Sequence, residues 1–380
     1  MKIHCNKDEL VDGVQTVQSG LSSRTTLPIL LNFLIETEKS RLKVVSTDLE
    51  MGVRHYLPAE IVNEGSITIP AKKFVDILHS LPEGQEIRIS VDAGGRLQLQ
   101  CGKSVFGIMG APKSEYPLLP EFNQQAAFEV PAAQLGEMIS RTIFAAATDE
   151  IKHALNGVYW TAKGGTLEMA ATDGRRLAVE KRDILDKGKN FHIIVPKKIL
   201  GEFLRLLSSW GIKEGGEGEK ENASISVSEN QISIRVKDTT LLSRLISGQY
   251  PKYDQLIPSK KDGNSGMAVI KTENFLAVTR RAALCATERG GSVKYTLSRG
   301  TLKVNAASPY LNFDDEIPAS YDGQEISVAF NPQFVVEALK HTESEETGLT
   351  VSSSFNPALL EPAGKGKGGY FFIVMPMRVS

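Results

Sequence analysis

A pattern that occurs three times along the chain is the feature that most constrains its fold. In each copy an apolar run leads to a proline, and a segment with helical character follows. The three copies occupy residues 66–78, 192–200 and 327–336, at a spacing of about 130 residues. Because a repeated sequence folds into a repeated structural unit, the chain of 380 residues is predicted to contain three equivalent domains.

Two further series of segments keep the same period and the same order. One reads as a strand followed by a helix and opens each repeat, and the other reads as a strand that breaks at a short polar pair. Several segments that recur in one order favour duplication over chance. The opening segments are residues 3–17, 128–143 and 268–283, and the later strands are residues 42–49, 167–174 and 302–308.

The repeats predict an α+β fold, in which each domain has two short helices packed on antiparallel sheets. Segments such as 223–227 and 233–236 alternate apolar and polar residues, as half-buried antiparallel strands do. Pro70, Pro131 and Pro196 stand just before helical segments, where a missing N–H group costs nothing.

Polar stretches mark the predicted domain boundaries. Residues 123–125 separate the first domain from the second, and residues 259–266 separate the second from the third. A charged, glycine-rich stretch at 213–222 lies inside the second domain and is predicted to be a solvated hairpin loop. The predicted domains are residues 1–124, 125–258 and 259–380.

Composition excludes several classes of protein. Hydrophobic residues make up 41% of the chain, which is ample for packed cores and excludes a disordered chain. The formal net charge is −1, so any nucleic-acid surface must come from local clusters of the 44 Lys and Arg residues. Cys5, Cys101 and Cys285 show no disulfide or metal spacing and are predicted to be reduced core thiols. No signal-like segment and no long apolar run is present, so the expected location is the cytoplasm.

The sequence contains no recognisable catalytic motif. It has no Walker-type phosphate loop, no His-Glu-x-x-His pair and no Gly-x-Ser-x-Gly elbow. Asp173 and Arg176 could be taken for a base and its cationic partner, but Asp173-Gly174 is a strong signal for a turn between strands. Thr47-Asp48 stands at the equivalent place in the first repeat, as a repeated structural turn requires. The prediction is a protein without enzymatic activity, cofactor or metal.

Five strings resemble those of one known family. They occupy residues 26–30, 47–51, 81–84, 171–179 and 374–378. Taken in order, they resemble the bacterial DNA sliding clamps, the beta subunits of DNA polymerase III, and the match covers all three repeats. The resemblance implies a head-to-tail homodimeric ring of six clamp-type domains, with helices lining the hole and sheets outside.

The resemblance also implies the function. Family members are DNA polymerase processivity factors that encircle duplex DNA, slide freely and tether the replicative polymerase. The implied partners are double-stranded DNA, bound without sequence preference, and the replicative polymerase, the clamp loader, other polymerases and repair proteins, which bind through short linear motifs. No membrane partner is expected.

Simple geometry is compatible with such a ring. Twelve helices side by side at ~10 Å spacing form a circle of ~120 Å circumference. The circle is ~38 Å across the helix axes, or roughly 28 Å clear after one helix width of ~10 Å is removed. Duplex DNA is a rod of roughly 20 Å, with major grooves ~8.5 Å deep, and would pass through this opening.

A protein that slides on DNA needs long cationic side chains that touch phosphates, because phosphate contacts carry no sequence information. A pair of lysines recurs at one repeat position, as Lys72-Lys73 and Lys197-Lys198, whereas the third repeat has Pro332-Gln333 there. Arg24 lies in a loop that the family uses to contact DNA. The candidate DNA-binding residues are Arg24, Lys72, Lys73, Arg141, Lys197, Lys198, Arg280 and Arg281.

By position, the resemblance also implies an apolar groove between the second and third domains that accepts partner peptides. Methionine suits such a site because its flexible, polarisable side chain adapts to different ligands. Met375 and Met377 fit ordinary core packing of a last strand equally well, so the resemblance alone assigns them to the groove. The candidate groove residues are Leu155, Thr172, Gly174, Arg175, Arg176, Leu177, Pro251, Leu256, Asn331, Phe334, Phe355, Pro357, Val374, Met375, Pro376 and Met377.

A ring also needs an interface between subunits. By position, Phe106 and Ile108 on an edge strand of the first domain are expected to meet Ala283 and Leu284 of the third domain in the other subunit. Apolar residues on an edge strand invite pairing unless they are covered. The same residues would also fit a simple core.

Two other classes of protein stay open at this point. An enzyme on a triplicated scaffold would place a titratable cluster in one repeat, and the sequence shows none. An interaction protein with no DNA role would lack paired basic residues on its helices and would elute as a monomer.

Overall fold

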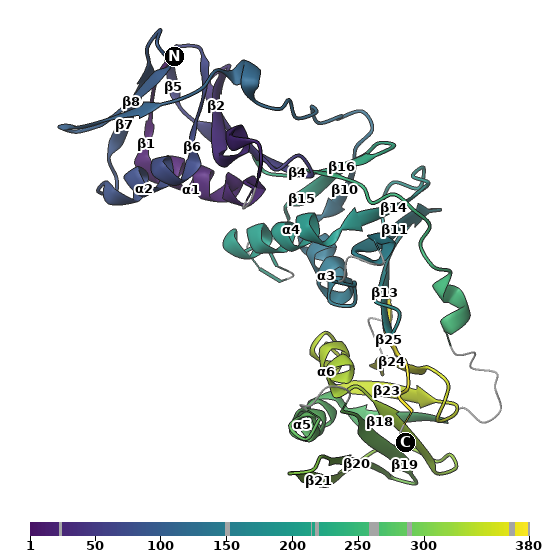
Figure 1. The fold of residues 1–380 in the computed structure, drawn as a ribbon. Coiled ribbons are helices and arrows are strands. Elements are labelled where there is room, and N and C mark those ends of the chain that lie inside the picture. The colour runs from purple at the N-terminus through teal and green to yellow at the C-terminus, as the bar shows by residue number, and fades with distance from the viewer. Residues whose placement is uncertain are drawn as a thin grey trace. The chain divides into compact units, whose positions relative to one another are not determined.

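The computed structural model describes residues 1–22, 25–148, 153–213, 215–216, 220–257, 266–286, 291–364 and 369–378. Over these residues the chain has an α+β fold, and its helices and strands are labelled in Figure 1. It forms two compact units. The first contains Met1–Gly136 and Lys198–Leu245, and the second contains Glu137–Lys197 and Ile246–Ser380.

The described part of the chain contains six α-helices, two in each repeat, which confirms the prediction. Side chains cap two of them. Asn6 accepts hydrogen bonds from the N–H groups of Asp8 and Glu9, and Asn331 accepts one from Gln333, so N–H groups without helical partners are satisfied. The helices are α1 (Lys7–Val17), α2 (Ala71–Ser80), α3 (Ala132–Ile143), α4 (Lys197–Ser209), α5 (Thr272–Ala283) and α6 (Pro332–Lys340).

Two antiparallel sheets build the first unit. The five-stranded sheet has the order β5 (Glu60–Asn63), β1 (Lys2–Asn6), β7 (Glu86–Val91), β8 (Arg96–Cys101) and β9 (Ser104–Met109). The eight-stranded sheet has the order β10 (Phe128–Pro131), β15 (Asn222–Val227), β16 (Gln231–Val236), β17 (Thr239–Arg244), β4 (Met51–Pro58), β3 (Arg41–Thr47), β2 (Asn32–Glu38) and β6 (Ser66–Pro70). Helices α1 and α2 lie side by side, and both contact this larger sheet.

Two antiparallel sheets also build the second unit. The eight-stranded sheet has the order β14 (Phe191–Pro196), β11 (Gly157–Lys163), β12 (Thr166–Thr172), β13 (Arg176–Asp183), β25 (Tyr370–Val374), β24 (Ala358–Ala363), β23 (Glu346–Val351) and β18 (Gly266–Lys271). The four-stranded sheet has the order β21 (Asn312–Pro318), β20 (Thr301–Ala307), β19 (Val293–Ser298) and β22 (Ile326–Phe330). Helix α5 contacts α6 and this smaller sheet.

The structure confirms the three repeated series. The strand–proline–helix segments are β6 with α2, β14 with α4, and β22 with α6. The opening segments are β1 with α1, β10 with α3, and β18 with α5. The strands that break at a polar pair are β3, β12 and β20. All of these elements belong to antiparallel sheets or to the helices that follow them, as the sequence predicts.

Each eight-stranded sheet runs across a boundary between repeats. In the first unit β4 pairs with β17, and in the second unit β13 pairs with β25. We call the β4–β17 pairing the first seam and the β13–β25 pairing the second seam. Backbone hydrogen bonds therefore join neighbouring repeats directly, and the central repeat contributes strands to both compact units.

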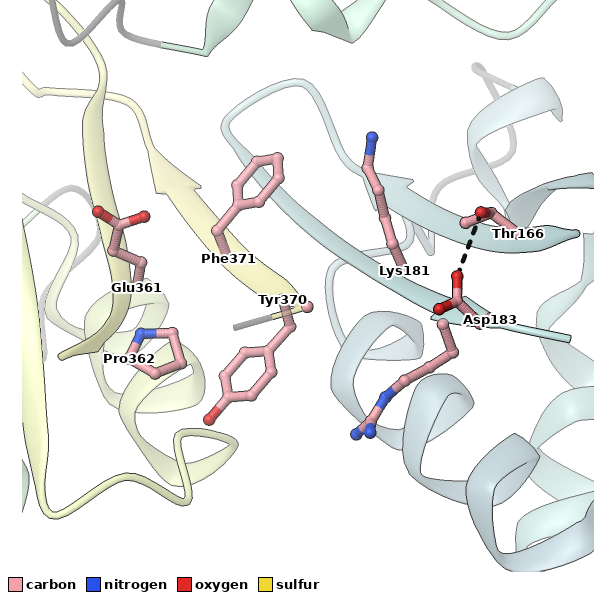
Figure 2. A pocket seen from close by; sticks show the side chains of 9 residues that line it. Thr166, Lys181, Asp183, Glu361, Pro362, Tyr370 and Phe371 are labelled. Atoms are coloured by element: carbon pink, nitrogen blue, oxygen red, sulfur yellow. Dashed lines mark hydrogen bonds between the residues drawn. The ribbon is translucent and has the colours of Figure 1, made fainter. Parts of the chain in front are cut away.

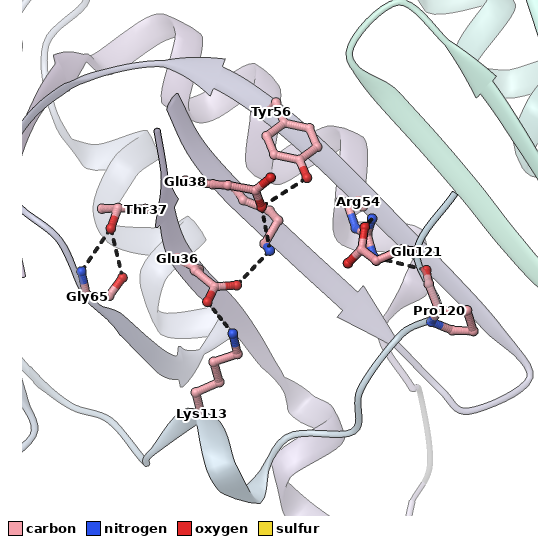
Figure 3. Close-up of polar contacts among 10 residues, drawn as sticks. Glu36, Thr37, Glu38, Arg54, Tyr56, Gly65, Lys113, Pro120 and Glu121 are labelled. Carbon is pink, nitrogen blue, oxygen red and sulfur yellow. Dashed lines mark hydrogen bonds and ion pairs between the residues drawn. The ribbon is translucent and has the colours of Figure 1, made fainter. Parts of the chain in front are cut away.

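The segment that leads out of the first repeat is held against the strands of that repeat. The Lys113 ammonium binds the Glu36 carboxylate, and Arg54 binds Glu121 at 2.6 Å (Figure 3). Arg54 also donates to the carbonyl oxygen of Pro120 at 3.1 Å. Between these two polar attachments the buried Tyr116 ring packs into an apolar cluster. The connecting segment is thus fixed at both ends and in its middle.

The Thr-Asp turns of the first two repeats use the same hydrogen bonds, at Thr47-Asp48 and at Thr172-Asp173. In both, the threonine hydroxyl donates to the carbonyl four residues on and accepts from the N–H two residues on. In both, the aspartate carboxylate accepts from the N–H groups two and three residues on. The predicted structural turn at Asp173 is therefore confirmed, and its carboxylate is engaged in holding that turn.

The two turns differ at the residue that takes positive φ. Gly174 has φ of 88°, which a glycine adopts without strain, whereas Leu49 has φ of 77° at the equivalent place. For a residue with a side chain, a backbone in the left-handed region costs roughly 1–2 kcal/mol of stability. Leu49 is 42% exposed, so burial of its side chain offsets only part of this cost.

We expect Leu49→Gly to raise the free energy of unfolding by about 0.5–1 kcal/mol, because it removes this strain. Gly174→Ala should lower it by about 1 kcal/mol, because it introduces the same strain in the second turn. Urea unfolding of both variants beside the parent chain measures the two changes. A loss of stability in Leu49→Gly would show that the Leu49 side chain contributes more by packing than its backbone costs.

Two sequence-based expectations need correction or lie outside the described residues. The stretch at 213–222 joins α4 to β15, so it connects a helix to a strand and the hairpin prediction was wrong. The polar segment predicted to separate the second and third domains lies almost wholly outside the described residues. Cys5, Cys101 and Cys285 are free and buried, as predicted. None of the described helices is long and apolar enough to span a membrane.

Candidate functional site

The candidate groove residues come from two repeats and meet around the second seam. Arg176 of β13 pairs with Val374 of β25. Beyond the end of β25, Met375 donates its N–H to the Arg175 carbonyl at 2.9 Å. Met377 then donates to the carbonyl of Ala329 at 2.8 Å. The last segment of the chain is therefore fixed by backbone hydrogen bonds to both the second and the third repeat.

Some of the candidate groove residues lie in the packed core of the second seam. Leu177 is 2% exposed and Val374 is 1% exposed, and both are part of the seam itself. Tyr250, which the sequence did not single out as a site residue, accepts a hydrogen bond from the Thr172 N–H at 2.9 Å. Its ring stacks on that of Tyr159 at 4.8 Å. Burial raises the pKa of Tyr250, so its hydroxyl stays neutral and available for hydrogen bonding.

Other candidate groove residues are apolar and accessible. Phe355 is 74% exposed and Leu256, in the short 3-10 helix Tyr253–Leu256, is 39% exposed. Met375, Pro376 and Met377 are partly exposed. Accessible apolar side chains are therefore present among the candidate groove residues.

Arg176 is the most constrained charged group at the seam. Its Nε lies 3.1 Å from Asp173 Oδ2, and its Nη2 donates to the Phe144 carbonyl at 2.7 Å. Its guanidinium lies over the Phe334 ring at 4.7 Å and over the Phe144 ring at 5.5 Å. These contacts fix the cation beside a cavity of about 290 Å³ that Arg175 and Lys197 also line.

The candidate DNA-binding cations fall into different environments. Lys72 and Lys73 are exposed on the first turn of α2, and neither forms an ion pair with a residue that the structure describes. Lys198 is paired with Asp48, and Arg281 is paired with Asp315 at 2.6 Å. Arg280 is exposed on α5, and Arg24 lies outside the described residues.

Arg141 does not fit the role that the sequence suggested. It is only 2% exposed, and its guanidinium contacts Glu180 at 2.8 Å and Glu343 at 2.6 Å. Glu137 lies 3.4 Å away, and the Tyr370 ring lies under the guanidinium at 4.5 Å. The prediction that Arg141 contacts DNA was wrong, because its charge is buried and matched by carboxylates of its own chain. A basic residue on a helix gives no sign in the sequence of the carboxylates that surround it.

We expect Arg141→Met to lower the free energy of unfolding by about 3 kcal/mol, because the fully buried Glu180 loses a cation and keeps only Arg182. Urea unfolding measures the change. Arg299→Met, at an exposed turn of the same unit, is the control and should change stability by less than about 0.5 kcal/mol. Equal, small effects of the two substitutions would contradict a structural role for Arg141.

Of the four residues expected at the subunit interface, three are accessible and one is buried. Strand β9 is an edge strand, as predicted, but Ile108 is only 7% exposed and belongs to the core. Val105 and Met109, on the other face of β9, are each 60% exposed and were missed. Phe106 is partly exposed. The alternation of β9 could have revealed the exposed face, because residues two apart share a face of a strand.

The third repeat also has an edge strand with accessible apolar residues just before it. Strand β21 is an edge strand, and Tyr310 and Leu311 just before it are 90% and 48% exposed. Leu284, at the end of α5, is 65% exposed, and Ala283 is partly exposed. The first and third repeats therefore each carry an edge strand with accessible apolar side chains beside it.

A second cavity of about 540 Å³ lies at the other end of the second seam (Figure 2). Lys181 and Asp183 of β13 line it opposite Tyr370 and Phe371 of β25. Lys181 is paired with Glu168 at 2.5 Å, so its ammonium is already neutralised. Among the described residues no group of three His, Cys, Asp or Glu side chains is placed to hold a metal ion.

Taken together, these features define a class: a triplicated α+β protein with sheets continuous across its repeats, accessible apolar side chains near one seam and edge strands with accessible apolar residues on them or just before them. Three models of the DNA polymerase III beta subunit match in succession. Its N-terminal domain matches residues 1–120, its central domain residues 129–252 and its C-terminal domain residues 254–378.

Known proteins of this kind match over the full length. The chain is 31% identical to the beta sliding clamp of Proteus mirabilis and 30% identical to that of Chlamydia pneumoniae, covering 100% of this chain and 100% and 99% of the relatives. It superposes on the Bacillus subtilis sliding clamp with a TM-score of 0.92 and a sequence identity of 27%. On the griselimycin-bound clamp of Pseudomonas aeruginosa the TM-score is 0.90 and the identity is 28%. Both superpositions cover 100% of each chain. The chain belongs to the DNA polymerase III beta subunit family, the bacterial sliding clamps, whose role is that of a processivity factor in DNA replication.

Proposed function

We propose that two copies of this chain close head to tail into a ring around duplex DNA, with β9 of one subunit beside β21 of the other. The observation that supports this proposal is the pair of edge strands in the first and third repeats, each with accessible apolar side chains on it or just before it. An uncovered edge with exposed apolar residues invites pairing with another chain. Because the two edges are different surfaces, their pairing is heterologous, and such contacts form a ring when the rotation closes.

The ring would hold DNA by topology, with weak contacts to phosphates. Lys72, Lys73 and Arg280 are exposed on helices, whereas α1 exposes the acidic Glu9 and Asp12. A mixture of this kind suits a protein that must move along DNA, because a continuous cationic lining would bind phosphates tightly. We propose Lys72, Lys73, Lys198, Arg280 and Arg281 as the DNA-facing cations, with Arg24 retained from the family resemblance.

The groove at the second seam would bind short peptide segments of the polymerase, the clamp loader and other partners. Accessible Phe355, Met375 and Met377 beside a rigid seam support this proposal. Flexible methionines accept different apolar anchors, so several partners can compete for one site. The sliding clamps bound to griselimycin show that proteins of this fold accept a small ligand.

We propose that the chain catalyses no reaction and that it acts in the cytoplasm. Asp173 and Arg176, which could have been taken for an acid–base pair, are both engaged in turn and aromatic contacts. The proposed domain limits stay at residues 1–124, 125–258 and 259–380. The first two family models, at 1–120 and 129–252, lie inside these limits. The third model, at 254–378, begins ahead of the proposed limit at 259.

The ring proposal predicts that the chain elutes from gel filtration near twice 41.5 kDa. After loading by a clamp loader, it should stay on closed circular DNA and leave when the circle is cut. Val105→Glu should shift elution toward the monomer, because it places a charge in the apolar edge contact. Lys163→Glu, at an exposed position of β11 in the second unit, is the control. Retention on cut and closed DNA alike would contradict topological binding.

For the cations, we expect the double substitution of Lys72 and Lys73 by Ala to weaken DNA binding uniformly across sequences. The slope of log K against log salt should fall by about 2, since each lost phosphate contact removes about 0.9. Fluorescence anisotropy over a salt series measures the slope, and Lys163→Ala with Lys187→Ala is the matched control. An unchanged slope would remove both lysines from the DNA-binding surface.

A further inference from the structure

The two seams are built on the same kind of ladder but differ at one equivalent position. His55 of β4 and Glu180 of β13 are each the fifth residue of their strand. Each pairs with the first residue of the partner strand, which is Thr239 in the first seam and Tyr370 in the second. We propose that His55 makes the first seam a proton-sensitive joint: a proton on its ring loosens the β4–β17 ladder and leaves the β13–β25 ladder unchanged.

In the second seam this position belongs to a buried ion cluster. Glu180 is 0% exposed and binds Arg141 and Arg182, each at 2.8 Å. The Arg141 guanidinium also binds Glu343 and lies over the Tyr370 ring. Two guanidinium groups therefore compensate the buried carboxylate, and the ladder is joined by charges that match.

The first seam has no such cluster around its ladder. Thr16 is the tenth residue of α1, where α3 has Arg141, so the guanidinium is missing. His55 Nδ1 lies 2.9 Å from the Thr239 hydroxyl oxygen. The other side of the ring faces α1, which passes so close that a Cβ atom at Gly13 would lie 3.3 Å from His55 Cδ2 and 3.8 Å from Nε2. A protonated ring needs an acceptor at both nitrogens, and Thr239 serves only one of them.

Three charged groups lie around the His55 ring. Asp12 comes from α1, Arg41 from β3, and Asp238 from the turn before β17. Arg41 and Asp238 are bound to each other, and neither aspartate forms an ion pair with His55. Burial has the largest effect and lowers the pKa of His55, with Arg41 acting in the same direction and Asp238 and Asp12 opposing it.

The direction of the pH effect follows from this arrangement. A histidine in an unfolded chain has a pKa of about 6.5, whereas the pKa of His55 in the closed seam is lower. Between these two values the opened seam binds more protons than the closed seam, so opening becomes easier as the pH falls. Above about pH 7 the ring is neutral in both states, and the seam has its full stability.

Two backbone amides at equivalent places report on the two seams. The Tyr56 N–H donates to the Asp238 carbonyl at 3.0 Å in the first seam, and the Lys181 N–H donates to the Gly369 carbonyl at 2.7 Å in the second. Hydrogen exchange of both amides in the full-length protein is measured at about pH 7.5 and about pH 5.5, and each rate is divided by the intrinsic rate at that pH. The protection factor of Tyr56 should fall about fivefold, and that of Lys181 should stay constant.

Two substitutions connect the effect to one ring. His55→Asn retains an amide that can bind the Thr239 hydroxyl but takes up no proton, so it should remove the pH effect at Tyr56. His192→Asn, which replaces an exposed histidine of β14, is the matched control and should keep the effect. If His55→Asn does not fold, NMR titration of the histidine rings in the parent protein tests the same point, and the His55 ring should titrate below about pH 6.5.

An equal fall in the protection of the two amides would show that acid loosens the whole protein and would overturn the proposal. A pH effect at Tyr56 that survives in His55→Asn would assign it to another group, with the same consequence. A His55 ring that titrates at or above about pH 6.5 would also overturn it, because the closed seam would then bind a proton as readily as the opened one.

Discussion

Backbone pairing across the boundaries between repeats is the interaction on which the rest of this structure depends. If each repeat had closed its own sheets, the junctions would be ordinary side-chain contacts between domains. Instead, β4 pairs with β17 and β13 pairs with β25, so each junction has the regular geometry of an antiparallel ladder. The candidate groove residues on these two strands are held in register by that ladder, because Arg176 faces Val374 and the Met375 N–H binds the Arg175 carbonyl.

The sequence predicted the architecture well because the architecture is repeated. A pattern that occurs three times makes each single prediction more secure. The strand predicted before Pro70 is supported by the same pattern before Pro196. The turn at Asp173 was correctly assigned for the same reason, since Thr47-Asp48 repeats it. Helix number, strand alternation and the order of elements all follow from patterns that are local in sequence.

The errors concern properties that depend on partners distant in the chain. Arg141 looked like a surface cation, but Glu180 and Glu343, from two other segments, surround it. Ile108 looked like an interface residue, yet it lies on the core face of β9. The periodicity of a strand shows which residues share a face, but a short apolar strand does not reveal which face is covered. Tyr250 was passed over because its hydrogen bond to Thr172 has no local signature.

The second seam also has a consequence for how the chain folds during its synthesis on the ribosome. Strand β13 is synthesised long before β25, and until Tyr370–Val374 emerges one side of β13 has no neighbour. During that interval its apolar residues Leu177 and Val179 stand beside unpaired backbone groups, a combination prone to misassociation in nascent chains. The candidate groove residues Arg175 and Met375 come together only with that last pairing, so the proposed peptide site does not exist before β25 has been made.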